Sequence, residues 1–346
     1  MNSSIKNIEG KSLGTGTNGD INDAPQYFDD PATEYRVATS QAAFFDRGER
    51  GWIRVEGRDR RTWLNNLITN DIRGLAADAG CYAFALDVKG RIQFDLNVFN
   101  AADALWLDVD ATIAPKAIKN LELHAITEDV RMVDVSHSFA RLGCVGPRSG
   151  DIAARLGVRD YDTLPALTLH HITDVVMLFR HDFTGMPGFE LTVSGAPAAD
   201  WLRRITQAGA APVGRATLEV LRIEAGIPML GRELDDTVLP AETGCLERAV
   251  SISKGCYLGQ EIVERMRSRG SLARRLVRLH LSDAKSITPP CSIFENGNAI
   301  GRVTSLARHP VRGDWHGLGY LKTKISDTAR LSIGEDGCNI DGFEWI

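Results

Sequence analysis

The eight residues from Lys254 to Glu261, K-G-C-Y-L-G-Q-E, combine an amine, a thiol and the start of a helix. Cys256 follows Lys254 by two positions. In an extended segment this spacing places both side chains on one face, where an ammonium lowers the pKa of a thiol. Tyr257 then points the other way, and Gly259 is suited to the N-cap of the helix that follows. The spacing predicts an activated thiol, and the alternative is a buried, unreactive cysteine in a tight turn.

Residues 80–99 have the pattern of a β-hairpin with its turn at Lys89-Gly90. The return strand alternates apolar and polar residues, so that Phe94 and Leu96 belong to one face and Asp95 to the other. By pattern alone, this alternation favours a half-buried strand whose polar face is solvated.

Two further segments each contain a charged residue whose role the pattern alone leaves open. The hairpin 177–193 carries Glu190, whose carboxylate can accept two parallel N–H donors or simply lie on the surface. The segment 221–228 carries Arg222, which can pair with the carboxylate of a ligand or with Glu224.

Composition limits the class of protein. The chain has 346 residues, 43% of them hydrophobic, with a formal net charge of −5, which is enough for two or three domains with cores of their own. No apolar run is long enough to cross a membrane, and the first residues lack the apolar region of a secretory signal. The six cysteines are scattered without metal-ligand spacing. We expect a cytoplasmic protein with reduced thiols and no protein-held metal, acting without nucleic acid or membrane.

The chain divides into three parts by pattern. Residues 1–34 are polar and predict a disordered tail, in which Gly14, Gly16 and Gly19 spell a dinucleotide motif without the strand and helix that such a motif needs. Strand and helix patterns alternate over 35–270, and short strands with turns over 271–346 predict a small antiparallel β-barrel.

The octapeptide that contains Cys256 resembles the signature of the YgfZ-type folate-binding proteins. These are relatives of the aminomethyltransferase T-protein of the glycine cleavage system and are implicated in iron–sulfur protein maturation. The strand G-R-I-Q-F-D-L-N-V is similar to a T-protein hairpin in which an aspartate projects into the folate cavity, and Asp95 is the matching residue. Tyr82, on the partner strand, matches an aromatic residue near the folate. Glu190 matches the glutamate that reads the pterin, and Arg222 an arginine near the folate.

The chain departs from the T-protein pattern at three residues in two segments. Met186 and Pro187 replace two acidic residues in the turn of the second hairpin, so contacts made by those acidic residues are in doubt. Leu230 replaces the tyrosine of a Y-G pair, which fits the YgfZ-type branch better than a glycine-cleavage enzyme.

The resemblance implies an α+β fold with two halves of a folate-binding domain, an added β-barrel and a central channel for the folate. It implies tetrahydrofolate or 5,10-methylenetetrahydrofolate as the cofactor. The implied function is support of iron–sulfur protein assembly or repair, with Cys256 as the functional thiol beside Lys254 and Asp95. The alternative is a folate-dependent aminomethyl or one-carbon transferase with Asp95 as the catalytic group; a partner-binding scaffold comes third. Whether there is turnover is left open.

The expected partners are the folate itself and iron–sulfur carrier or client proteins, with the chain as a monomer. A run of arginines over 265–278 is either a solvated face or a surface that attracts a polyglutamylated folate tail or an acidic partner.

Overall fold

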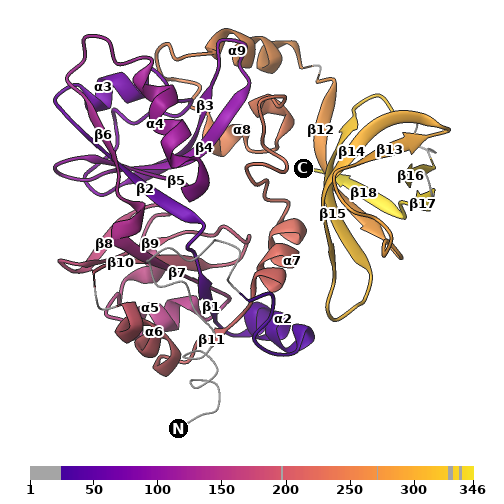
Figure 1. The fold of residues 1–346 in the computed structure, drawn as a ribbon, viewed down its shortest axis with the longest axis horizontal. Coiled ribbons are helices and arrows are strands. Elements are labelled where there is room, and N and C mark those ends of the chain that lie inside the picture. Colours follow the sequence, from indigo (N-terminus) through magenta and orange to yellow (C-terminus); the bar gives the residue numbers. More distant parts are fainter. Residues whose placement is uncertain (1–24, 196–197, 271, 326–329, 335–336) are drawn as a thin grey trace. The chain divides into compact units, whose positions relative to one another are not determined.

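The computed structural model describes residues 25–195, 198–270, 272–325, 330–334 and 337–346 (Figure 1). The tail predicted for residues 1–34 therefore lies largely outside the described residues, and so do the three glycines of the dinucleotide-like motif. Two compact units form, and each collects segments that are distant in sequence. Unit 1 contains the described part of Met1–Asn65 together with Ile72–Cys81 and Leu96–Leu218, and unit 2 contains Asn66–Asp71, Tyr82–Asp95 and Glu219–Ile346.

Unit 1 contains a six-stranded sheet with the strand order β11-β1-β7-β10-β9-β8, in which only the β1 and β11 pair is parallel. The strands of this sheet are β1 (Ala43–Asp46), β7 (Phe139–Val145), β8 (Leu169–Thr173), β9 (Val176–Arg180), β10 (Gly188–Ser194) and β11 (Ala211–Pro212). The helices of the same sequence region are α2 (Pro31–Ser40), α5 (Ser149–Arg155) and α6 (Ala198–Gln207).

A second sheet has the order β3-β4-β5-β2-β6, and its first two strands pass from one unit into the other along their length. Its strands are β2 (Arg50–Glu56), β3 (Gly80–Leu86), β4 (Ile92–Asn100), β5 (Leu105–Asp110) and β6 (Arg131–Asp134), accompanied by α3 (Arg60–Asn65) and α4 (Ala114–Glu122). Short 3₁₀ turns lie at Ala111–Ile113, Ser136–Ser138, Tyr161–Thr163 and Pro240–Glu242.

The first helix, α2, begins four residues before the Tyr35 at which we expected ordered structure. Asp30 accepts a hydrogen bond from the backbone N–H of Thr33 at 3.0 Å and so caps the helix. Glu34 is 2% exposed and accepts hydrogen bonds from the backbone N–H of Gly214 and from the hydroxyl of Thr217. Buried acceptors inside unit 1 thus fix this helix, a feature that the polar composition of residues 1–34 does not reveal.

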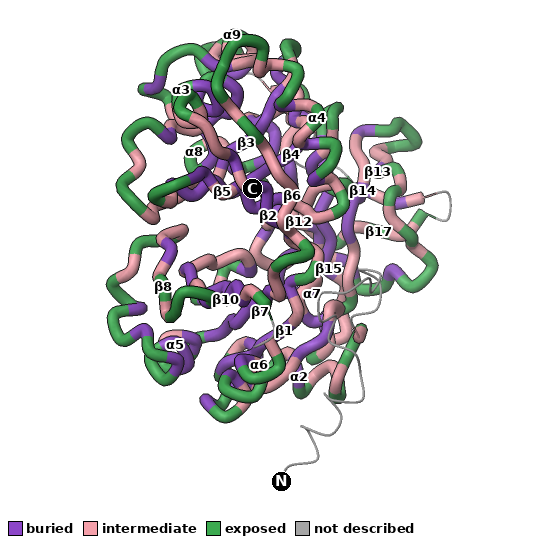
Figure 2. Tube along the Cα trace, turned by 60° about the vertical axis from the view of Figure 1, so that its left-hand side comes forward, coloured by how far each residue is buried: buried purple, intermediate pink, exposed green. Residues whose placement is uncertain are grey.

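The predicted β3–β4 hairpin is present, and local chemistry explains its turn. The carboxylate of Asp87 accepts hydrogen bonds from the backbone N–H groups of Lys89 and Arg91, and Gly90 has a φ of 72°, which favours glycine. The prediction of a solvated polar face on β4 is wrong, because Asp95 is 9% and Asn97 2% exposed. Figure 2 shows how the buried residues gather in the strands while exposed residues occupy the loops.

Unit 2 contains a seven-stranded antiparallel sheet with the order β17-β16-β13-β14-β15-β12-β18. Its strands are β12 (Arg274–Leu281), β13 (Cys291–Glu295), β14 (Asn298–Arg308), β15 (Trp315–Lys322), β16 (Leu331–Ile333), β17 (Cys338–Asn339) and β18 (Gly342–Trp345). The antiparallel sheet predicted for 271–346 is confirmed. The strand order of its described residues has two ends, so the sheet is a curled half-barrel rather than a closed barrel (Figure 1).

Three helices complete this part of the chain: α7 (Arg215–Ala225), which begins in unit 1, α8 (Leu246–Ala249) and α9 (Gln260–Arg269). One apolar cluster joins the distant segments of unit 2. It contains Phe84 of the hairpin, Tyr257 of the octapeptide, and Leu276 and Tyr320 of the half-barrel. The hairpin end that carries Asp95 therefore rests on a core made of later segments.

Candidate active site

Asp95 lies on β4 with its carboxylate almost removed from solvent. The phenolic O–H of Tyr82, on β3, donates to Oδ2 of Asp95 across 3.1 Å. Burial, reinforced by the negative charge of Asp95, raises the pKa of Tyr82 well above its ordinary value. Tyr82 thus stays protonated at physiological pH and remains a donor to the carboxylate. The structure thus brings together two residues that the resemblance placed near the folate.

A guanidinium and a thiol complete this group of side chains. Arg248, in α8, lies with its guanidinium carbon 4.9 Å from the ring centre of Tyr82. Its Nη2 donates to the sulfur of Cys245 at 3.1 Å. Cys245 precedes the helix and is 3% exposed, whereas Arg248 is exposed. Carboxylate, phenol, guanidinium and thiol thus form one cluster within unit 2, which we call the Asp95 cluster and which consists of Asp95, Tyr82, Arg248 and Cys245.

The segment 66–71 connects this cluster to the octapeptide. The side-chain amide of Asn70 donates to the backbone carbonyls of Tyr82 and Arg248, at 2.8 and 3.0 Å. The ammonium of Lys254 donates to the carbonyls of Ile68 and Asn70, both at 2.7 Å. Lys254 therefore stabilises the segment 66–71, and Asn70 in that segment holds the backbone of Tyr82 and Arg248 in place.

The predicted pairing of Lys254 with Cys256 on one face is wrong. Lys254 and Tyr257 are buried, at 9% and 7% exposure, and the ammonium lies 5.1 Å from the centre of the Tyr257 ring. Cys256 is exposed. The reason is local backbone: Lys254 ends a bend, the next three residues belong to no helix or strand, and burial recurs after three residues instead of two. The ammonium that was expected to activate the thiol is held by two backbone carbonyls.

The helix start predicted after Gly259 is confirmed, and a close approach explains the glycine. Gly259 is the N-cap of α9 with a φ of 82°, and a Cβ there would lie 2.6 Å from the backbone oxygen of Asp87. Across the contact, a Cβ on Gly90 would lie 2.7 Å from the Cβ of Ile262. Two glycines thus let the tip of the hairpin pack directly against the first turn of the helix.

Arg222 is a buried structural residue in this fold. It is 6% exposed, and its five N–H donors bind Glu219 twice and Glu233, the carbonyl of Ile227 and the hydroxyl of Ser305 once each. An arginine has five such donors, so none is left for the carboxylate of a ligand. A contact between Arg222 and a folate therefore requires one of these partners to be displaced and stays a prediction. The acidic partners of Arg222 are Glu219 and Glu233 rather than Glu224.

Glu190 lies in unit 1, on β10, with no exposed surface. Its Oε1 accepts from Nη2 of Arg47 at 3.1 Å and is 2.7 Å from Nδ1 of His181, while its Oε2 accepts from Arg141. Burial acts to raise the pKa of Glu190, but the two guanidinium groups overcome it and hold the pKa well below the ordinary value. A pterin contact at Glu190, as the sequence predicted, requires one of these partners to move.

The ion pairs of Glu190 extend into a buried chain of charges in unit 1. Arg141 also donates to Asp108, which accepts from Arg50 at 3.0 Å and from the side-chain amide of Asn97 at 2.7 Å. Burial acts to raise the pKa of Asp108, but Arg141 and Arg50 lower it to about 2. The guanidinium of Arg141 stacks 4.7 Å from the ring centre of Trp52. These contacts form a buried network of alternating charges that stabilises unit 1, although Nε of Arg141 and Oδ1 of Asn97 have no hydrogen-bond partner among the described residues.

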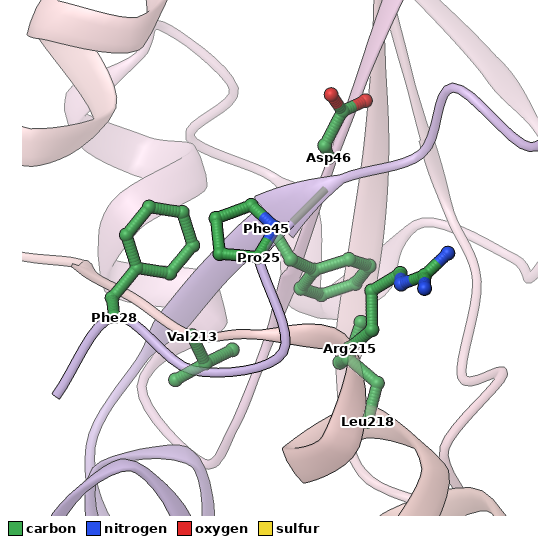
Figure 3. Close-up of a pocket in the computed structure, with 7 residues that line it drawn as sticks. All are labelled: Pro25, Phe28, Phe45, Asp46, Val213, Arg215 and Leu218. Carbon is green, nitrogen blue, oxygen red and sulfur yellow. The ribbon is translucent and has the colours of Figure 1, made fainter. Parts of the chain in front are cut away.

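Two hollows lie among the described residues, one in each unit. One, in unit 1, is lined by Pro25, Phe28, Phe45, Val213 and Leu218, with the charged ends of Asp46 and Arg215 turned away from the apolar side chains (Figure 3). It measures about 10 Å³, far below the several hundred Å³ of a site for an organic cofactor. The other, in unit 2, is about 200 Å³ and is lined by Glu224, Arg278, His280, His316 and Glu344 among others.

Known proteins resemble this chain in sequence and in fold. Residues 17–254 match the family model described as the GCVT N-terminal domain, which is more than half of the chain. The chain belongs to the GCVT N-terminal domain family. An aminomethyltransferase of Listeria monocytogenes serotype 4a (strain HCC23) is 29% identical over 321 residues, covering 91% of this chain and 86% of that protein. One of Rubrobacter xylanophilus is 28% identical over 307 residues, covering 87% and 82%.

A solved structure with the same fold is the glycine cleavage system aminomethyltransferase T from Bartonella henselae. Its TM-score is 0.79 at 21% identity, and the match covers 90% of this chain and 86% of that one. This GCVT-family chain therefore has the mixed α/β fold of that protein, with the curled antiparallel half-barrel in unit 2. Within the described residues, no helix is long and apolar enough to span a bilayer.

Sequence reasoning overlooked two members of the Asp95 cluster in this GCVT-family chain. Cys245 and Arg248 are three residues apart, a spacing that brings side chains together on one helical turn, and this was the signal available. The predicted arginine run divides between α9 and β12. Arg267 pairs with Glu264, and Arg274 pairs with Glu242, so these two arginines already have acidic partners in their own unit.

Proposed function

We propose that the chain catalyses folate-dependent one-carbon transfer, of the kind named by its aminomethyltransferase relatives, with Asp95 as the catalytic group. The observation that carries this proposal is the carboxylate of Asp95, which is 9% exposed and oriented by Tyr82, whose ring lies beside the guanidinium of Arg248. A buried charge of this kind acts strongly on a neighbouring cation because little water screens it.

The Asp95 cluster has the chemical groups needed to bind a nitrogen atom that reacts. A carboxylate on an enclosed strand can accept a hydrogen bond from an amine and stabilise the positive charge that develops on that nitrogen when it takes up a one-carbon unit. Tyr82 restricts the carboxylate to one orientation without neutralising it. When bound, tetrahydrofolate, or its 5,10-methylene form, supplies the nitrogen that takes up or releases the one-carbon unit. Glu190 and Arg222 are engaged in ion pairs with other protein side chains, so this proposal rests on Asp95 and not on them.

Tetrahydrofolate is expected to stabilise the purified protein. At about one hundred times its dissociation constant it adds about 2.7 kcal/mol to the free energy of unfolding, which corresponds to a rise of several degrees in Tm. Calorimetry with and without the ligand measures this, and a paired assay with an aminomethyl donor measures transfer. A protein that shows neither stabilisation nor transfer contradicts the proposal.

A second candidate, support of iron–sulfur protein maturation, is favoured by one observation. Cys256 is exposed, next to the buried Lys254 and Tyr257 that fix the backbone of its turn. An exposed thiol between two buried neighbours is accessible to a partner protein or a metal cluster. Thiolates are also the preferred ligands of iron–sulfur clusters.

If this second function holds, Cys256→Ser will fold and bind tetrahydrofolate like the wild type but will not restore iron–sulfur enzyme activity in cells that lack the protein. A hydroxyl matches the thiol in size but is neither a comparable nucleophile nor a soft ligand. The matched control is Cys338→Ser, at another partly exposed thiol, which is expected to restore activity fully. Full restoration by Cys256→Ser removes this candidate.

A further inference from the structure

Arg248 differs from the other arginines of its surroundings in how its donors are used. Within the part of the chain that the structure describes, the guanidinium of Arg248 donates a hydrogen bond to the sulfur of Cys245 and forms no salt bridge with a carboxylate. A thiol is a weak acceptor, so this bond is easily exchanged for a stronger one. Most of the five N–H donors of Arg248 therefore remain for solvent or for a ligand.

The contrast with Arg222 makes this difference informative. Both arginines lie in unit 2, and both lie in helices, but Arg222 is 6% exposed with every donor bound, whereas Arg248 is exposed. The guanidinium carbon of Arg248 lies 4.9 Å from the centre of the Tyr82 ring, and this contact restricts the orientation of the guanidinium. Preorganised, weakly paired guanidinium groups are the usual receptors for carboxylates.

We propose that Arg248 binds the carboxylate of the compound that reacts at Asp95. The guanidinium of Arg248 then holds the anionic end of this substrate, and the carboxylate of Asp95 holds its amine or cationic end. The inference rests on the proposed one-carbon transfer and names the substrate class of that same site. Because Tyr82 contacts Asp95 by its hydroxyl and Arg248 by its ring, it sets the separation of the two charges. Cys245 is a positioning residue that holds the guanidinium until the carboxylate arrives.

Two sources can supply this carboxylate: the glutamate tail of the folate, or an amino-acid-like one-carbon donor. Bidentate pairing with a carboxylate serves either of them. The source is the compound whose affinity falls when the guanidinium is removed. Two pairs of probes separate them, tetrahydrofolate against tetrahydropteroate, which lacks the glutamate, and glycine against methylamine, which lacks the carboxylate.

The test is Arg248→Met in the full chain, with binding of the four probes measured by calorimetry or ligand-detected NMR. We expect Kd to rise about 10- to 100-fold for one carboxylate-bearing probe, tetrahydrofolate or glycine, while Kd for its carboxylate-free counterpart changes less than about twofold. Arg248→Lys, which keeps the charge but not the fork, is expected to recover part of the loss. Unchanged affinity for both carboxylate-bearing probes overturns the proposal, and so does a wild type that binds none of the four.

Arg204→Met provides the matched control. Arg204 is also exposed and stacks on an aromatic ring, with its guanidinium carbon 4.8 Å from the ring centre of Trp201 in unit 1. Its replacement removes the same side chain and the same stacking without touching the Asp95 cluster, so we expect wild-type affinity for all four probes. Because these measurements need no turnover, the Arg248 contact can succeed or fail independently of the transfer reaction.

Discussion

Replacing Asp95 by asparagine is expected to lower kcat for one-carbon transfer by about a hundredfold or more. The amide keeps the shape of the side chain and an oxygen that accepts the Tyr82 hydrogen bond, which is 3.1 Å long in the wild type. It loses the negative charge that stabilises the cation formed during transfer. Charge stabilisation in enclosed sites contributes about 10²- to 10³-fold to kcat, which sets the size of the effect.

If Asp95 is catalytic, Asp95→Asn must still bind tetrahydrofolate. We expect Kd for tetrahydrofolate to change by less than about threefold, because the lost interaction strengthens mainly in the transition state. Tyr82→Phe, which removes only the orienting hydroxyl, is expected to have the smaller effect, about tenfold in kcat. An Asp95→Asn enzyme with wild-type kcat would show that the carboxylate is structural.

Arg141→Met is expected to reduce the free energy of unfolding by about 3 to 5 kcal/mol, the usual cost of breaking a buried ion pair by removing one partner. Arg141 is 3% exposed and donates to both Glu190 and Asp108, neither of which has exposed surface. Without it, two carboxylates stay buried with fewer counter-charges. Urea unfolding of wild type and variant measures the difference.

The surface provides a control for this prediction. Arg148 pairs with Asp151 at 2.9 Å, with half of each side chain exposed, so Arg148→Met should change the free energy of unfolding by less than about 1 kcal/mol. Equal losses in Arg148→Met and Arg141→Met would contradict the argument that burial decides the cost.

The same ion pairs set the acid stability of the wild type. The folded-state pKa values of Glu190 and Asp108 lie below their ordinary values, that of Asp108 at about 2. Their contribution is therefore complete above the ordinary carboxylate pKa of about 4 and is lost as the pH falls from there towards 2. In Arg141→Met the folded-state pKa values rise, so this acid-sensitive contribution should be smaller.

The sequence predicted elements well where turn chemistry and periodicity agree. Lys89-Gly90 between alternating strands located the β3–β4 hairpin, and Gly259 located the start of α9. Periodicity reports which residues share a face of a strand, but it does not report what covers the second face. The polar face of β4 therefore appeared solvated, although tertiary packing buries Asp95 and Asn97.

The candidate site was predictable only in part, because its members come together through tertiary contacts. Asp95 and Tyr82 face each other across one hairpin and could be found from sequence. Arg248 and Cys245 reach them from a segment about 150 residues later. Lys254 was assigned to the wrong neighbour because a two-residue spacing puts side chains together only in an extended segment, and this segment turns.

Unit 2 has a consequence for how the chain is made on the ribosome. Its hairpin segment ends at Asp95, but the segments that cover Phe84 and support Tyr82 begin at Glu219, about 120 residues later. At the usual rate of about 5 to 20 residues per second, the finished hairpin waits roughly 6 to 25 seconds before its partners have been synthesised. During that interval its apolar side chains are open to nascent-chain chaperones, and a synonymous change in codon usage between the two segments would alter the length of the exposure without altering the protein.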